Sequence, residues 1–233
     1  MEEVKILRFL RFPMLPASSG ELLFLRRKLF MRKNIIKRMC FDAIFAALSI
    51  ILYVIGPKFP IPFLFPSFLD VQFSMLPVLI ATFMLGPVDG LIVILTRFII
   101  KLAFGSTTMG VGETSDMILS VVVVLIISLV SNILKNKDFS EKKKWVIKFV
   151  TIIGSWILGS LLSNSFCIPM YCLLWGEENV MNLIMVFPFV NETNWLLYYF
   201  TLAVIPFNLM LSTLVGIVTL LVNKHLLSFY NRI

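Results

Sequence analysis

Residues 116–134 read Asp-Met-Ile-Leu-Ser-Val-Val-Val-Val-Leu-Ile-Ile-Ser-Leu-Val-Ser-Asn-Ile-Leu, and the only charged side chain in this run is its first. A helix needs about 17–25 apolar residues to cross a bilayer, and this stretch has that length and composition. Lipid offers no hydrogen-bond partners to the backbone, so a spanning segment must satisfy its own by becoming helical. This stretch therefore predicts a transmembrane helix and decides the class of the fold.

Similar apolar stretches lie on both sides of it, at 39–56, 72–86, 89–104, 147–173 and 197–223. Hydrophobic residues make up 59% of the 233-residue chain, and the mean hydropathy is +0.95. This composition is too apolar for a soluble domain. We expect an all-α integral membrane protein in which six transmembrane helices form one domain over residues 39–225.

The charges of the connections give the orientation. Lysine and arginine gather in residues 1–38, in the connection at 135–148 and after residue 223. Positively charged loops stay on the cytosolic side, so both termini and this connection are expected in the cytosol, residues 226–233 forming a short cytosolic tail. The same arrangement accounts for the net charge of +8 without a nucleic-acid partner.

Residues 1–38 form a basic, amphipathic segment without the long apolar core or the small-residue cleavage site of a signal peptide. Met31 opens the sequence Met-Arg-Lys-Asn, which would be a natural start for a compact membrane protein. We expect residues 1–30 to be either a cytosolic extension that lies on the membrane surface or the result of an early start codon. N-terminal sequencing of the native protein distinguishes the two.

The chain has no motif for catalysis, ATP hydrolysis or metal binding. Its glycine-rich segment at 105–113 lacks the Gly-Lys-Ser/Thr of a phosphate-binding loop, and no nucleophile with a nearby acid–base pair is apparent. Cys40, Cys167 and Cys172 have neither metal-ligand spacing nor the pattern of a disulfide framework. We therefore expect no enzyme, no metal and no cofactor, and a membrane protein that binds a ligand or a partner.

Polar side chains inside the apolar stretches are the best candidates for a site. Asn164 and Asn208 each lie toward the outer half or the middle of an apolar stretch, and an amide offers both donors and an acceptor. Together they favour a pocket for a neutral, hydrogen-bonding ring, although each could instead bond to an adjacent helix. Arg97 lies mid-helix, where an ionisable group generally faces a polar cavity or a partner, while Lys101, one turn later, can extend its side chain to the outer surface.

The loop at 56–69 combines four prolines with several phenylalanines, among them Phe63, Phe65 and Phe68. Proline prevents a regular helix here and favours a stiff, extended chain. On the expected topology the loop faces outside. It is either a lid over a pocket for an apolar or aromatic ligand, or a segment lying in the membrane interface.

A small-residue face marks the first stretch. Ala43 and Ala47 lie one turn apart, and small residues allow another helix to approach closely in lipid. This face either packs inside the chain or docks a separate membrane subunit.

Four segments in order resemble the substrate-binding S components of energy-coupling-factor (ECF) vitamin transporters, most closely the riboflavin-specific type. The resemblance covers roughly residues 38–225, and its segments are 73–90, 105–113, Asn164 with Pro169 and Tyr171, and Pro206-Phe-Asn208.

The resemblance implies a six-helix subunit of the bacterial cytoplasmic membrane that binds a vitamin on its outer side and docks on a transmembrane coupling subunit carrying two cytosolic ATPases. Ala43 and Ala47 match the docking motif. Asn164 and Asn208 match asparagines that bind the flavin ring, and riboflavin is then the transported ligand. The other residues expected at the ligand or at the outer mouth of the pocket are Tyr171, Phe63, Phe65, Phe68, Gly110, Gly112, Glu113 and Arg97.

The sequence departs from the riboflavin type at several positions. Gln72 and Met75 replace two acidic residues, and Leu211 replaces a lysine. Arg97-Phe98 replaces Lys-Asn, which keeps the charge and loses the amide. These changes leave open an S component for another vitamin or precursor. A membrane scaffold protein without a ligand is the second alternative, because small-residue faces also serve helix packing.

Overall fold

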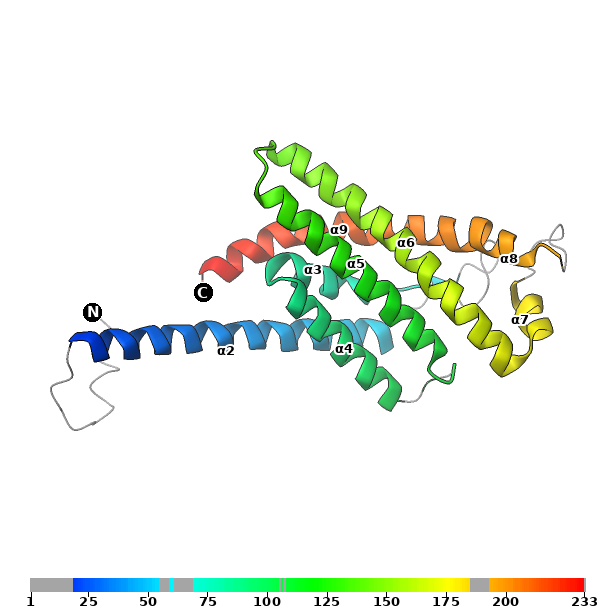
Figure 1. The fold of residues 1–233 in the computed structure, drawn as a ribbon, viewed down its shortest axis with the longest axis horizontal. Helices are drawn as coiled ribbons and strands as arrows, with labels where there is room; N and C mark the ends of the chain where they lie inside the picture. Colours follow the sequence, from blue (N-terminus) through cyan, green and yellow to red (C-terminus); the bar gives the residue numbers. More distant parts are fainter. Residues whose placement is uncertain are drawn as a thin grey trace. The chain divides into compact units, whose positions relative to one another are not determined.

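The structure is a computed structural model that describes residues 19–54, 59–60, 69–104, 106, 108–184 and 193–232. The contacts divide the chain into two units, Met1–Cys40 and Phe41–Ile233. The described elements, shown in Figure 1, are α2 (Ser19–Val54), β1 (Phe59–Pro60), β2 (Asp70–Val71), α3 (Met75–Met84), α4 (Pro87–Ala103), α5 (Val111–Lys135), α6 (Glu141–Trp175), α7 (Glu177–Ile184), α8 (Trp195–Tyr198), the π-helix η1 (Tyr199–Val204) and α9 (Ile205–Arg232).

The predicted helical class is confirmed, because each of the six apolar stretches lies largely within a helix. The bounds depart from those predicted, and two of the departures affect how the helices can cross a membrane. The first stretch belongs to α2, which already begins at Ser19, and the second gives only the 10-residue α3. At about 1.5 Å per residue α3 is about 15 Å long, roughly half of the hydrocarbon core. Among the residues that the structure describes, three helical segments are long and apolar enough to cross a membrane: Val111–Lys135, Glu141–Trp175 and Trp195–Tyr230.

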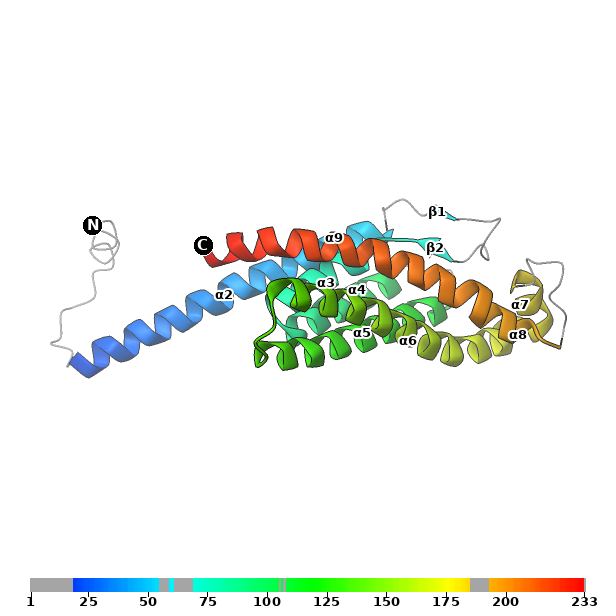
Figure 2. The ribbon, with the colours of Figure 1, turned by 90° about the horizontal axis from the view of Figure 1, so that it is seen from above.

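Within the unit Phe41–Ile233, α5 and α6 form an antiparallel hairpin that makes the most extensive helix–helix contact (Figures 1 and 2). Helix α9 packs against α6, and the short pair α3–α4 packs against α5 and α9. Gly159 explains how closely α5 and α6 approach, since a Cβ atom there would lie 3.0 Å from the carbonyl oxygen of Leu119. Small side chains thus allow the helix contacts, as expected in lipid.

Backbone breaks are encoded by glycine and proline. Gly86 has a φ of 126° between α3 and α4, a conformation that glycine tolerates, and Pro87 then starts α4. In the last long helix, Pro206 has no N–H to donate to the preceding turn. The helix is widened into η1 just before this proline. A π-helical turn is rare and is frequently found at functional sites.

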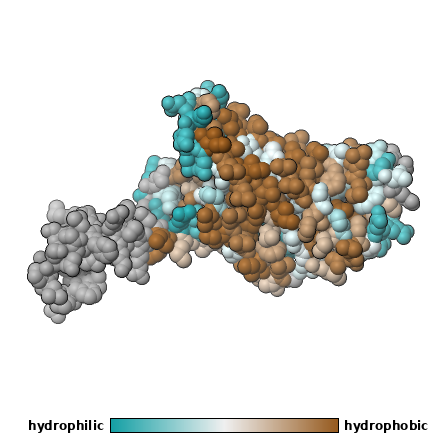
Figure 3. Space-filling model, viewed as in Figure 1, coloured by the Kyte–Doolittle hydropathy of each residue, from teal (hydrophilic) through white to brown (hydrophobic). Residues whose placement is uncertain are grey.

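The surface of the helices is apolar. Large hydrophobic side chains stay exposed along α4, α5, α6 and α9, for example Ile99 at 63% and Leu129 at 64%. Figure 3 shows this as a broad hydrophobic band on the viewed face of the molecule. A soluble protein rarely exposes a contiguous apolar surface of this kind, so lipid is its natural surrounding.

Candidate functional site

One cavity of about 170 Å³ opens between the segment before α3 and helices α5, α6, η1 and α9. Its wall is formed by Leu69, Gln72, Ser74, Met75, Gly112, Ser115, Asp116, Leu119, Trp156, Ser163, Asn164, Tyr171, Tyr199, Phe207, Asn208 and Leu211. The lining mixes hydroxyl and amide groups with aromatic and aliphatic side chains. Such a lining suits a mainly apolar ligand that carries a few hydrogen-bonding groups.

Asn164 lies on α6 at the wall of this cavity. Its Oδ1 accepts a hydrogen bond of 2.6 Å from the hydroxyl of Tyr199, on η1. Its Nδ2 donates to the carbonyl oxygen of Ser160, one turn earlier, at 2.8 Å. One N–H and one acceptor position of the amide remain available, because an amide has two donors and two lone pairs.

Asn208, on α9, makes the same kind of bonds: it accepts one from an aromatic side chain and donates one to a backbone carbonyl. Its Oδ1 accepts a 3.0 Å bond from the indole N–H of Trp156, and its Nδ2 donates to the carbonyl oxygen of Val204 at 2.9 Å. Helix α6 thus supplies one asparagine and one aromatic donor, and the η1–α9 segment supplies the matching pair. The two amides bond to adjacent helices, as one of the two interpretations predicts, and they also line the cavity.

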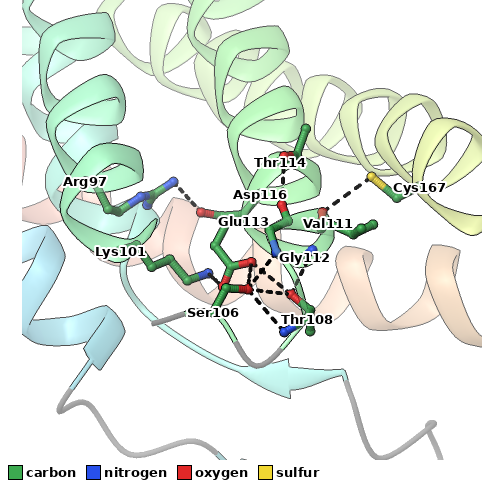
Figure 4. Close-up of polar contacts among 11 residues, drawn as sticks. Arg97, Lys101, Ser106, Thr108, Val111, Gly112, Glu113, Thr114, Asp116 and Cys167 are labelled. Carbon is green, nitrogen blue, oxygen red and sulfur yellow. Dashed lines mark hydrogen bonds and ion pairs between the residues drawn. The ribbon is translucent and has the colours of Figure 1, made fainter. Parts of the chain in front are cut away.

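Arg97 of α4 is buried, with a side chain only 2% exposed, and forms an ion pair of 2.7 Å between its Nη2 and Oδ2 of Asp116 on α5. The same nitrogen donates to Ser120 Oγ at 2.7 Å, and Nη1 donates to Ser74 Oγ at 3.3 Å. Asp116 and Ser74 line the cavity, whereas Arg97 lies behind them. The guanidinium therefore holds an acidic group at the cavity wall, as Figure 4 shows.

A second polar cluster organises the loop before α5. The carboxylate of Glu113 accepts hydrogen bonds from Ser106 at 2.6 Å and from Thr108 at 2.8 Å, and it lies 3.6 Å from Nζ of Lys101 (Figure 4). Lys101 also lies 3.4 Å above the ring of Tyr53. Lys101 does not extend to the outer surface, since it is 9% exposed and paired inside the bundle. Without a partner, a buried ammonium would be costly.

The predicted site residues divide into three groups. Asn164, Asn208, Tyr171 and Gly112 line the cavity together. Gly110, Glu113 and Arg97 lie outside its lining: Glu113 and Gly110 shape the loop before α5, and Arg97 supports the wall. The predicted lid residues Phe63, Phe65 and Phe68 fall outside the described part of the chain.

Sequence reasoning missed three residues of this wall. Trp156 and Tyr199 donate to the two amides, and Asp116 carries the acidic group. An aromatic side chain in an apolar helix looks the same in sequence whether it meets lipid or a cavity. Asp116 had a visible signal, because a carboxylate at the start of an apolar stretch needs a cationic partner, and Arg97 was already identified.

Gln72, Met75 and Leu211, which depart from the pattern of the riboflavin type, all line the same cavity. These three sequence differences therefore lie where a bound ligand would contact the chain.

Comparison with known proteins supports the resemblance to ECF S components. The family model described as "ECF transporter, substrate-specific component" matches residues 37–223. The riboflavin transporter RibU of Staphylococcus aureus (strain TCH60) is 30% identical over 210 residues, which cover 89% of this chain and 98% of that protein. A solved structure described as the S component of a bacterial ECF transporter is 28% identical, with a TM-score of 0.56, and covers 83% of this chain and 96% of that chain.

The family match spans most of the chain, and the long apolar helices make it a multi-pass membrane protein. The chain therefore belongs to the family of ECF transporter substrate-specific components, which are transport subunits and not enzymes.

Proposed function

We propose that this chain captures riboflavin, or a closely related flavin, from the outer side of the cell membrane for uptake by an ECF transporter. The observation that carries the proposal is the convergence of the amides of Asn164 and Asn208 on one cavity, each amide with hydrogen-bonding capacity left. The 30% identity to a riboflavin transporter supports the choice of ligand.

The chemistry of the amides suits a flavin ring. The pyrimidine edge of a flavin alternates hydrogen-bond acceptors with a donor, and an amide can pair with both kinds of group. In an apolar pocket such bonds discriminate strongly, because a buried polar group without a partner costs about 1–3 kcal/mol. The aromatic residues Trp156, Tyr171 and Tyr199 offer flat apolar surface to the ring.

The cavity has to widen for such a ligand. Its volume of about 170 Å³ is below the roughly 300–1,000 Å³ usual for small-molecule sites. Tyr199 and Trp156 occupy one acceptor position on each amide, so their displacement both enlarges the cavity and frees the amides. We propose that Gly110 and Glu113 hold the loop at the cavity mouth, that Arg97 supports the wall through Asp116, and that Phe63, Phe65 and Phe68 close over the ligand.

The proposal includes six membrane crossings with both termini in the cytosol. Helix α3 is short, and the segment 69–74 that precedes it, which contains the strand β2, would complete its crossing. A transmembrane coupling subunit and two cytosolic ATPases would supply the energy. The exposed Ala43 and Ala47 on α2, beside the buried Ala46, support docking of a partner helix there.

The test is a titration of the purified chain with riboflavin, followed by quenching of flavin fluorescence. Saturable quenching is expected for the unchanged chain. Asn164→Ala and Asn208→Ala should each weaken binding about tenfold or more, the loss expected for one hydrogen bond in a dry site. Asn136→Ala changes an exposed amide in the α5–α6 connection and serves as the control.

If both cavity variants bind as tightly as the unchanged chain, the proposed pocket is wrong. A well-folded chain without any quenching would instead favour the second candidate, an S component for another vitamin or precursor. Met75 and Leu211 carry that alternative, because both put apolar groups at the cavity wall where the riboflavin type has charges.

A further inference from the structure

A second, larger cavity of about 360 Å³ lies at the opposite end of the α5–α6 hairpin. It is lined by Thr82, Phe83, Met84, Leu85, Gly86, Pro87, Ser128, Ser131, Asn132, Leu134, Lys135, Glu141, Lys144 and Lys148. None of these residues lines the first cavity. Along α5, Leu119 of the first cavity and Ser128 of the second are nine residues apart, about 14 Å at 1.5 Å per residue.

Three lysines give this cavity an excess of positive charge. Among the described residues of its wall, Glu141 is the only acidic one, and its Oε1 lies 3.4 Å from Nζ of Lys144. Lys135 lies 3.5 Å from the amide oxygen of Asn132. Lys148 is half-buried 5.6 Å above the ring of Phe83, and within the described part of the chain no carboxylate lies in ion-pair distance of it.

The helix ends at this cavity do not supply its charge. Met84 ends α3, Leu85 is its C-cap, and Pro87 begins α4, so a negative and a positive helix terminus meet at the same wall. Their partial charges are of similar size and opposite sign. The lysine side chains therefore decide that the cavity attracts anions, while Ser131 and Asn132 add hydrogen-bonding groups.

The positive-inside rule explains why lysines gather in this region, but it does not explain why some of them are half-buried at the cavity. Lys142 and Lys143 follow the positive-inside rule equally well and are exposed. Lys144 and Lys148, one and two turns into α6, are half-buried and turned into the cavity.

Exposed apolar side chains lie along the same turns of α5 and α6 as this polar cavity. Ile133 on α5 and Val146 and Val150 on α6 are exposed by 59%, 53% and 60%. Trp145, which is 41% exposed, stacks on Phe149 at 5.6 Å between ring centres. Tryptophan is enriched at the depth of the lipid headgroups. Figure 3 shows hydrophilic surface at the end where α5 joins α6, directly above the hydrophobic band.

We propose that this cavity binds the phosphate of an anionic phospholipid from the cytosolic leaflet. The phosphate lies between Lys135, Lys144 and Lys148, and the acyl chains follow the exposed apolar residues beside them. A free phosphate would use the lysines but not these apolar residues, whereas a lipid uses both. Basic pockets between membrane helices on this side commonly hold anionic headgroups. The inference depends on the cytosolic location of the α5–α6 connection and not on the identity of the vitamin.

The experiment titrates the full-length chain in neutral detergent with dioctanoyl phosphatidylglycerol and with dioctanoyl phosphatidylcholine, counting bound lipid by native mass spectrometry. The unchanged chain should prefer the anionic lipid. Lys144→Gln/Lys148→Gln should weaken that binding about tenfold or more, since each lysine near the headgroups contributes attraction. Glu141→Gln removes the competing carboxylate and should tighten it.

The matched control is Lys142→Gln/Lys143→Gln, which removes the same charge from the same end of α6 without changing a residue that lines the cavity. Equal losses in the two double variants would overturn the proposal, because the attraction would then come from net charge alone. Equal binding of the two lipids would overturn it as well. Competition by millimolar inorganic phosphate would overturn the lipid assignment in favour of a free anion.

A further outcome concerns a protein occupant. If the chain shows no preference for the anionic lipid, yet Lys144→Gln/Lys148→Gln blocks co-purification of partner subunits, the cavity holds an acidic segment of a partner and the proposal fails. Riboflavin binding of each variant, which depends on the other cavity, checks the fold independently.

Discussion

At the scale of single residues, the ion pair of Arg97 and Asp116 is the main polar feature inside the bundle. The arginine reaches four side chains from three parts of the chain: Ser49 on α2, Ser74 before α3, and Asp116 and Ser120 on α5. A planar guanidinium can do this because its five donors point in fixed directions. Asp116 therefore lies at the cavity wall with its negative charge compensated by Arg97, which is outside the cavity lining.

We predict that Arg97→Met lowers the free energy of unfolding by about 3 kcal/mol, because it leaves the carboxylate of Asp116 without its partner. The double variant Arg97→Met/Asp116→Leu should lose less than the single variant, since both charges are then gone. Denaturation in mixed detergent micelles measures both. With Asp116→Leu measured as well, a double variant whose loss equals the sum of the two single losses would show that the pair is not coupled.

At the scale of helices, small residues decide how the elements meet. Gly159 on α6 lies against the backbone of Leu119, and Gly216 on α9 lies against Phe149 and Ile152 of α6. In lipid the helices gain no hydrophobic free energy from meeting, so close van der Waals packing must hold them together. The cavity depends on this packing, because its two amides come from α6 and α9.

We predict that Gly159→Leu lowers stability by about 1–3 kcal/mol, since its side chain has to push α5 away. Gly154→Leu on the same helix is the matched control: a Cβ atom there meets nothing within 4 Å, and the position is exposed. Thermal unfolding in detergent should separate the two variants. Equal melting temperatures would mean that the α5–α6 contact does not depend on Gly159.

At the scale of the whole molecule, the surfaces proposed for the ligand, the lipid and the coupling subunit are separate. The amide-lined cavity lies near the start of α5, and the lysine-lined cavity lies near its end. Ala43 and Ala47 lie on α2 and line neither cavity. If the proposed assignments are correct, we expect that capture of a vitamin and assembly with a coupling subunit can be altered separately.

We predict that Ala43→Leu/Ala47→Leu leaves riboflavin affinity within about twofold and strongly reduces co-purification of the coupling subunit and ATPases. Both alanines are exposed, so the added bulk fits the isolated chain but blocks a closely approaching helix. Gly154→Leu adds similar bulk to an exposed position of α6 and should not affect assembly. Normal assembly of the α2 variant would place the docking surface elsewhere.

The sequence by itself determined the helical membrane class, the places of the apolar helices and the candidate amides Asn164 and Asn208. These features are local: hydropathy is read over one segment, and a lone amide in an apolar run is conspicuous. Only the tertiary structure decided which groups meet. For example, Tyr199 donates a hydrogen bond to Asn164, although the two residues are 35 positions apart in the sequence. Which side of an apolar helix meets a cavity depends on how its neighbours pack, and hydropathy alone does not contain that information.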